Sequence, residues 1–119
     1  MTYGFMMFKP KGAVPEIADL GEDTLVLQEP SGVVAGLTAL CPGIAWRRED
    51  DGSWFGSLDG EDGWYEFRID AQPDHCWTIS TSHRASTRNL VQVICNALGV
   101  VAFDGQIVKL IVPERPDSP

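Results

Sequence analysis

The sequence predicts an α+β domain in which two helices pack on one face of a single antiparallel sheet, most of it a meander. Four segments between residues 44 and 81 alternate in hydrophobicity and are separated by turn residues, which is typical of consecutive antiparallel strands. Two other segments, near residues 31–41 and 89–98, carry apolar residues at helical spacing. At 119 residues the chain has the length of one domain, with residues 1–112 as its body and 113–119 as a polar, proline-rich tail.

The expected strands follow from the alternation. Residues 2–8 are apolar on both faces, which indicates a central strand, and the meander strands are expected at 44–48, 53–58, 64–69 and 76–81. The odd-numbered residues from 65 to 69 are aromatic or aliphatic and should face the core, whereas Trp64, Glu66 and Arg68 should face the opposite side of the sheet. Within the poorly patterned stretch 13–29, residues 24–27 are expected to form a short edge strand.

The helix ends are predicted from capping chemistry. Ser31 is the candidate N-cap of the first helix, which Pro42 and the following glycine terminate. The second helix should end at Gly99, because glycine adopts the left-handed conformation at low cost. Asp104-Gly105 between two apolar segments predicts a closing hairpin. We expect one core containing residues of the sheet and of the second helix: Tyr65, Phe67, Trp77, Leu90, Ile94 and Leu98.

The cysteines and the apolar segments predict a cytoplasmic protein. Cys41, Cys76 and Cys95 are odd in number, and the apolar run at residues 5–8 is too short for a secretory signal and has no basic residues before it. We therefore expect three reduced thiols, with Cys41 and Cys95 buried on helices and Cys76 facing away from Trp77. No apolar run approaches the ~20 residues of a membrane span, so no membrane association is expected.

The charge is concentrated in one stretch of sequence. The formal net charge is −8, and residues 49–66 carry seven acidic residues and no Lys or Arg. The negative sign of the net charge argues against nucleic-acid binding, which requires cationic side chains opposite the phosphates. An acidic edge suits a basic protein partner, with Trp64 either as the aromatic anchor or half-buried on the second face of the sheet. The predicted partner-binding residues are Glu49, Asp50, Asp51, Asp59, Glu61, Asp62 and Trp64.

No motif in the chain predicts catalysis, a metal or a cofactor. The Asp-Gly pairs within residues 49–63 do not match the spacing of an EF-hand loop and are explained as turns. His75 and Cys76 are adjacent on a predicted strand, so they should point to opposite faces, and no CxxC or HxxxH pair is present. Nucleophile elbows, P-loops and dinucleotide-binding glycines are also missing.

One alternative site remains open. His83, Arg84 and Arg88 lie at the start of the second helix, where cations and free N–H groups can hold a phosphate or carboxylate. This would make the chain an anion-binding or small-molecule-binding domain, or an enzyme. In the competing interpretation the arginines pair with the carboxylates of the chain itself.

The chain resembles a class of small acidic α+β bacterial proteins, many of them uncharacterised, that includes toxin-immunity proteins. The resemblance is carried by residues 93–99 (VICNALG), by residues 103–106 (FDGQ) and by the helix that ends at Cys41, Pro42 and Gly43. It covers structural turns and caps and transfers no catalytic residue. The resemblance implies a non-enzymatic binder, and a toxin enzyme is one candidate for the basic partner that the charge predicts; the oligomeric state is left open.

Overall fold

The computed structural model describes residues 3–12, 16, 18, 21–60, 63–82, 84–105 and 108–113, and for residues 3, 22, 60 and 84–89 it describes the backbone only. It contains two helices and one seven-stranded sheet, so the predicted α+β class is confirmed. The elements are β1 (Tyr3–Phe8), a 3₁₀ turn (Glu22–Thr24), α1 (Pro30–Leu40), β2 (Ala45–Arg48), β3 (Trp54–Gly60), β4 (Gly63–Ile69), β5 (Cys76–Thr81), α2 (Arg84–Leu98), β6 (Val101–Asp104) and β7 (Lys109–Ile111).

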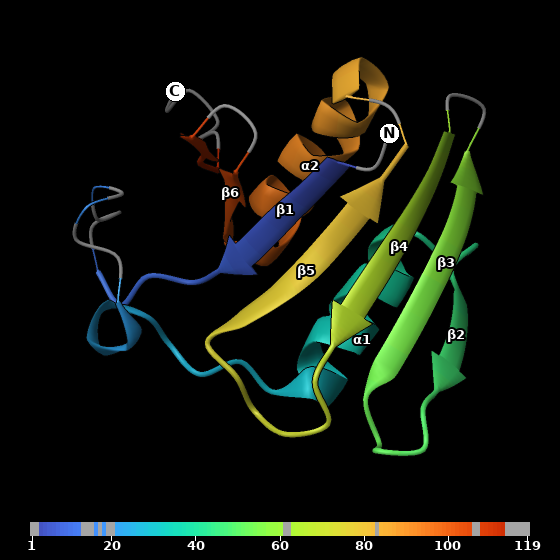
Figure 1. Cartoon of the computed structure of the whole chain (residues 1–119). Helices are drawn as coiled ribbons and strands as arrows, with labels where there is room; N and C mark the ends of the chain where they lie inside the picture. Colours follow the sequence, from blue (N-terminus) through green and yellow to red (C-terminus); the bar gives the residue numbers. More distant parts are fainter. Residues whose placement is uncertain are drawn as a thin grey trace, which may run out of the picture.

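The strand order is β2-β3-β4-β5-β1-β6-β7, and every neighbouring pair is antiparallel. The four meander strands are therefore consecutive, as predicted, and β1 lies between β5 and β6 in the interior of the sheet (Figure 1). In the same view α1 and α2 lie behind the strands. The crossover through α2 carries the chain from β5 past β1 to β6.

The register assigns the strand side chains to two faces, because residues directly opposite each other in a ladder point to the same side. Phe67 lies opposite Ile79, and Ile79 lies opposite Phe5; all three are almost completely buried. We name their side of the sheet the core face and the opposite side the second face. Trp64, Glu66 and Arg68 alternate with the buried residues of β4 and so lie on the second face, as predicted.

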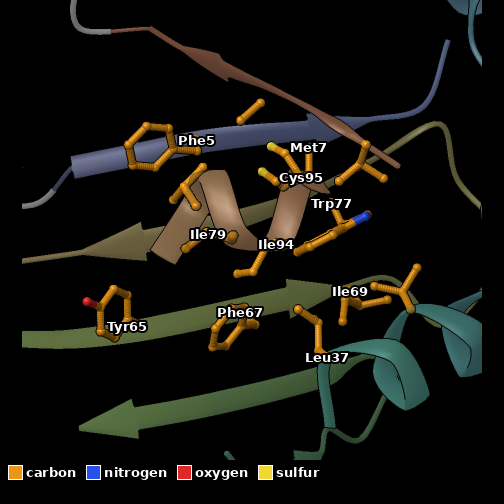
Figure 2. Packing of buried hydrophobic residues seen from close by; sticks show 14 of the residues in the cluster. Phe5, Met7, Leu37, Tyr65, Phe67, Ile69, Trp77, Ile79, Ile94 and Cys95 are labelled. Carbon is orange, nitrogen blue, oxygen red and sulfur yellow. The ribbon is translucent and has the colours of Figure 1, made fainter. Parts of the chain in front are cut away.

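A continuous core lies against the core face. Its members come from β1, β4, β5 and β6 and from both helices, and Figure 2 shows Ile94 and Cys95 of α2 among the strand residues. The predicted core is confirmed, with Leu90 and Leu98 packed against it as partly buried side chains. The cluster includes Phe5, Met7, Val33, Leu37, Tyr65, Phe67, Trp77, Ile79, Val91, Ile94, Cys95 and Ala102.

The prediction of an edge strand at residues 24–27 is wrong. The chain forms a 3₁₀ turn at Glu22–Thr24, and the residues after it make only isolated bridges to other segments. The side chain of Gln28 fixes this loop instead: its Oε1 accepts from the indole Nε1 of Trp77 at 3.0 Å, and its Nε2 donates to the carbonyl of His75 at 3.2 Å. A local pattern of apolar residues cannot reveal such a long-range contact.

The ends of the first helix also differ from the prediction. Ser31 is not the N-cap; α1 begins at Pro30, whose missing N–H costs nothing at a first helical position, and the N-cap Glu29 makes no side-chain capping bond. Cys41 is the C-cap residue rather than a helical one, and it is half-buried instead of buried. For α2 the predicted end is confirmed, because Gly99 has a φ of 66°.

The closing hairpin is present but its turn is longer than predicted. Asp104 is the last residue of β6, lies opposite Lys109 of β7 and is fully buried, so the connection begins at Gly105. Residues 106–107 of this connection and residues 114–119 of the predicted tail lie outside the described part of the chain.

Candidate functional site

The structure separates the predicted acidic edge into two groups. Residues 49–51 join β2 to β3, whereas Asp59 lies near the far end of β3. β3 has seven residues, and at roughly 3.4 Å per residue the two groups lie on the order of 20 Å apart. Glu61 and Asp62 lie outside the described residues. Residues that form one acidic stretch in the sequence thus mark opposite ends of one strand.

The turn between β2 and β3 is well organised. Arg47 Nη2 lies 2.9 Å from Glu49 Oε1 in an exposed ion pair. Asp51 Oδ1 accepts hydrogen bonds from the backbone N–H of Ser53 at 2.9 Å and from its hydroxyl at 2.6 Å, and these bonds lower the pKa of Asp51. Asp50 is exposed. The ion pair with Arg47 offsets the negative charge of Glu49. The turn therefore presents two uncompensated carboxylates to solvent, those of Asp50 and Asp51.

Two carboxylates at the same end of the sheet were missed by sequence reasoning. A hydrogen bond between Asp70 and Asp74 raises the pKa of the first and lowers that of the second, and the charge of Asp51 raises the Asp70 pKa further. Asp51 and Asp70 also line the same 130 Å³ cavity. The available signal was the meander itself, because alternate turns of antiparallel strands meet at the same end of a sheet.

Trp64 lies at the other end, on the second face. It is directly opposite Asp59 in the β3–β4 ladder, and its backbone N–H donates to Ser82 Oγ at 3.0 Å. The indole is half-buried. Of the predicted residues, the structure thus brings Trp64 and Asp59 together and places residues 49–51 away from them.

A ladder of arginine and aromatic side chains on the second face was not predicted. Arg47, Phe55 and Arg68 lie opposite one another on β2, β3 and β4. The guanidinium carbons of Arg47 and Arg68 lie 4.8 Å and 5.5 Å from the centroid of the Phe55 ring, which is the geometry of cation–π contacts. Both arginines are exposed. The ladder therefore faces solvent, next to the turn of residues 49–51: Arg47 is paired with Glu49, and Phe55 and Arg68 line the same cavity as Asp51.

The second face also contains a groove of 430 Å³ over β1, β5 and β6. The chain provides no side chain at Gly4, where an added Cβ would meet no atom within 4 Å. The register places Met6 opposite Thr78 on one side and opposite Phe103 on the other. The groove is lined by Gly4, Met6, Thr78, Ser80, Phe103 and Gly105, together with residues 5 and 79.

A second cavity lies away from this face. It measures 260 Å³ and is bordered by the loop at residues 26–29, the first turn of α1 and the residues around the end of α2. Its lining mixes Lys9 with apolar side chains such as Val33 and Val100.

The alternative anion site cannot be assembled from the described side chains. His83 lies outside the described residues, and Arg84 and Arg88 are described in their backbone only, in the first turns of α2. The structure therefore places these two positions on α2 and does not describe how their side chains are arranged.

Two of the three thiols are poor nucleophiles in this fold. Burial raises the pKa of Cys41 and raises that of Cys95 to about 12, which disfavours the nucleophilic thiolate. Across the described part of the chain, no three His, Cys, Asp or Glu side chains are grouped so that they could hold a metal ion. None of the helices in that part is long and apolar enough to cross a membrane.

The chain matches no protein-family model, no curated protein and no solved structure. Its function therefore has to be argued from the residues of the two faces, because a fold by itself does not determine a function.

Proposed function

We propose that the chain is a non-enzymatic, immunity-like protein-binding domain that uses the second face of its sheet, and the acidic turns at the two ends of that face, to bind a basic partner. The observation that carries this proposal is Trp64 opposite the exposed Asp59 on the second face, with the exposed Asp50 and Asp51 at the other end of β3. The ladder of Arg47, Phe55 and Arg68 lies on the same face, next to Asp50 and Asp51. Aromatic residues and arginine are enriched in the central parts of protein interfaces, where they supply most of the affinity.

The proposal includes the placement of both helices on the core face, which leaves the second face for the partner. What supports it is that both helices contribute residues to the large core, among them Leu37 and Ile94. The smaller cluster on the second face is formed by Phe8 and Val101 with Leu25 of the loop, and its described members include no helix residue. With that placement, the second face near β2–β4 would be covered, within the described part of the chain, by its own side chains alone.

Charge would direct the encounter. Residues 49–66 account for −7 of the net charge of −8, and complementary potentials raise association rates more than they raise affinity. Residues 49–51 and Asp59 are separated by about two and a half times the Debye length of ~8 Å at physiological ionic strength, so the two acidic groups act independently. Charge reversals at the two ends should therefore have additive effects on the binding free energy.

The resemblance to toxin-immunity proteins suggests a basic toxin enzyme as the partner. Such a complex would form in the cytoplasm, where the three thiols stay reduced. Binding would inhibit the toxin by covering its surface and would need no catalytic residue in this chain.

Affinity capture with the purified chain tests the proposal, followed by direct titration of the captured protein in low and high salt. We expect a basic partner whose affinity falls steeply with salt, and falls further in Asp50→Lys/Asp51→Lys, in Asp59→Lys and in Trp64→Ala. The matched control is Asp23→Lys, which makes the same charge change as Asp59→Lys at an exposed position of the 3₁₀ turn; Figure 1 draws this turn beyond the end of β1, across the picture from β2 and β3.

Binding that is insensitive both to salt and to these charge reversals would contradict the proposal. Saturable binding of inorganic phosphate that is lost in Arg84→Ala/Arg88→Ala would instead support the alternative anion site.

A further inference from the structure

We infer that Trp64 and Asp59 form the subsite for an arginine side chain of the basic partner, whose guanidinium lies over the indole ring and pairs with the carboxylate. This inference rests on the proposed function and names the residue type that the partner must present at this end of β3 and β4. It is carried by the register of the two side chains, by the lack of a cation beside them among the described residues, and by the way in which the arginines of the chain bind the neighbouring aromatic rings.

The register brings the two side chains together. Trp64 of β4 is directly opposite Asp59 of β3. The backbone N–H of Trp64 donates to Ser82 Oγ at 3.0 Å, and its carbonyl accepts from the backbone N–H of Ser82 at 3.3 Å, so both groups point away from β3. Asp59 and Trp64 are therefore a non-hydrogen-bonded pair, the kind whose side chains lie closest, with Cβ atoms about 4.5–5.5 Å apart. An indole and a carboxylate thus lie side by side on the second face.

Neither side chain has a charged partner within the described part of the chain. Asp59 is exposed, and the ion pair found there lies at the other end of β3. Trp64 is half-buried, and the cation–π contacts found there are made by the rings of Phe55 and Trp54. The carboxylate and the indole are therefore available to bind one cation together.

The arginines of the chain show what such a pair of groups can bind. The guanidinium carbon of Arg47 lies 4.8 Å from the centroid of the Phe55 ring, while its Nη2 lies 2.9 Å from Glu49 Oε1. The guanidinium carbon of Arg48 lies 4.6 Å from the centroid of the Trp54 ring, while its Nε donates to a backbone carbonyl at 2.8 Å. Each guanidinium thus contacts an aromatic ring and an oxygen acceptor at once. The pair on β3 and β4 offers the same two groups, and the partner would supply the guanidinium.

Arg68 does not take this place. It lies four residues after Trp64 on the same strand, which is about 14 Å along an extended chain. Its guanidinium carbon lies 5.5 Å from the centroid of the Phe55 ring. Glu66 lies between Trp64 and Arg68 on the same face, so Arg68 offsets its charge, and the subsite consists of Asp59 and Trp64 alone.

Arginine satisfies both groups better than lysine does. A planar guanidinium stacks on an aromatic ring and can donate two parallel N–H···O bonds to one carboxylate. The ammonium of lysine is a strongly hydrated point charge without such a fork. The subsite therefore selects arginine among the cationic side chains of a basic partner.

Titration of the full chain with short peptides, followed through the NMR signal of the Trp64 indole Nε1–H, tests the inference. Glycine alternates with arginine in one peptide, with lysine in the second and with citrulline, which has nearly the shape of arginine but no charge, in the third. We expect the arginine peptide to shift the Trp64 signal saturably. The lysine peptide of equal charge should bind there several-fold more weakly, and the citrulline peptide should leave the signal unchanged.

Asp59→Asn should weaken the binding of the arginine peptide at Trp64 several-fold and remove its advantage over the lysine peptide, because an amide has no charge and a single oxygen acceptor. The position is exposed, so the variant should keep the melting temperature of the native chain. Asp23→Asn is the matched control: it removes the same charge at an exposed position of the 3₁₀ turn, and it should keep both the affinity and the advantage.

The inference and the proposed function fail in different ways. Equal binding of the arginine and lysine peptides at Trp64, no shift of Trp64 with either, or an affinity unchanged in Asp59→Asn would overturn the arginine subsite and leave the proposed function standing. The proposed function itself fails if the captured partner is insensitive both to salt and to charge reversal.

Discussion

Burial strongly changes the chemistry of the Cys95 thiol. Cys95 is fully buried on α2, its sulfur lies 3.7 Å from the carbonyl oxygen of Ile111, and burial raises its pKa from 9.0 to about 12. Because the folded state holds the proton more tightly than the unfolded state, the resulting stabilisation is fully present below pH 9. It is lost as the pH rises from about 9 to about 12.

This gives a prediction for pH-dependent stability. Between those limits the Cys95 thiol should lower the free energy of unfolding by about 1.4 kcal/mol per pH unit. Urea unfolding of the native chain and of Cys95→Ala across this range measures it, because the difference between the two curves isolates the thiol. If the two curves of unfolding free energy against pH were parallel, the Cys95 thiol would not be shielded from water, contrary to the structure.

Adjacent positions of α2 should respond very differently to truncation. Ile94 is completely buried between the sheet and the helix, whereas Val93 is 46% exposed. Ile94→Ala should lower the free energy of unfolding by ~2–5 kcal/mol, since it removes buried methyl groups and leaves a cavity. Val93→Ala, the control, should change it by less than ~0.5 kcal/mol. Similar losses for the two variants in urea unfolding would show that the helix face is misassigned.

Sequence patterns predicted the elements whose stability is local or periodic. The bounds of β5 (Cys76–Thr81) match the prediction, and Gly99 ends α2 in the conformation expected of a glycine. The wrong predictions concern segments whose conformation depends on a residue far away in the sequence. The loop around Gln28 is fixed by Trp77, some fifty positions away, so the edge strand at 24–27 was an error of local reasoning.

The candidate site was only partly predictable for a related reason. A run of acidic residues in the sequence carries no information about the strand that separates its two ends, so residues 49–51 and Asp59 were assigned to one edge. Alternation within β4 did place Trp64 correctly on the second face. The Phe55 ladder needed the register between strands, which a single sequence does not provide.

At the scale of the whole molecule, the two faces of one sheet have separate roles in this account. The core face stabilises the fold through a cluster shared by the strands and both helices. The second face carries the arginine ladder, Trp64 and the open groove. Binding and folding would then depend on different side chains of the same strands, which is the central claim.

The most direct measurement of that claim compares two glycines on opposite faces of the sheet. Gly56→Ala should lower the free energy of unfolding by ~1–3 kcal/mol, because the new Cβ would lie 2.7 Å from the packed ring of Trp46. Gly4→Ala should leave it unchanged or raise it by roughly 0.5–1 kcal/mol, because the added methyl meets nothing and alanine restricts the unfolded chain. Urea unfolding of the two variants gives the answer. A destabilised Gly4→Ala beside an unaffected Gly56→Ala would contradict the assignment of the faces.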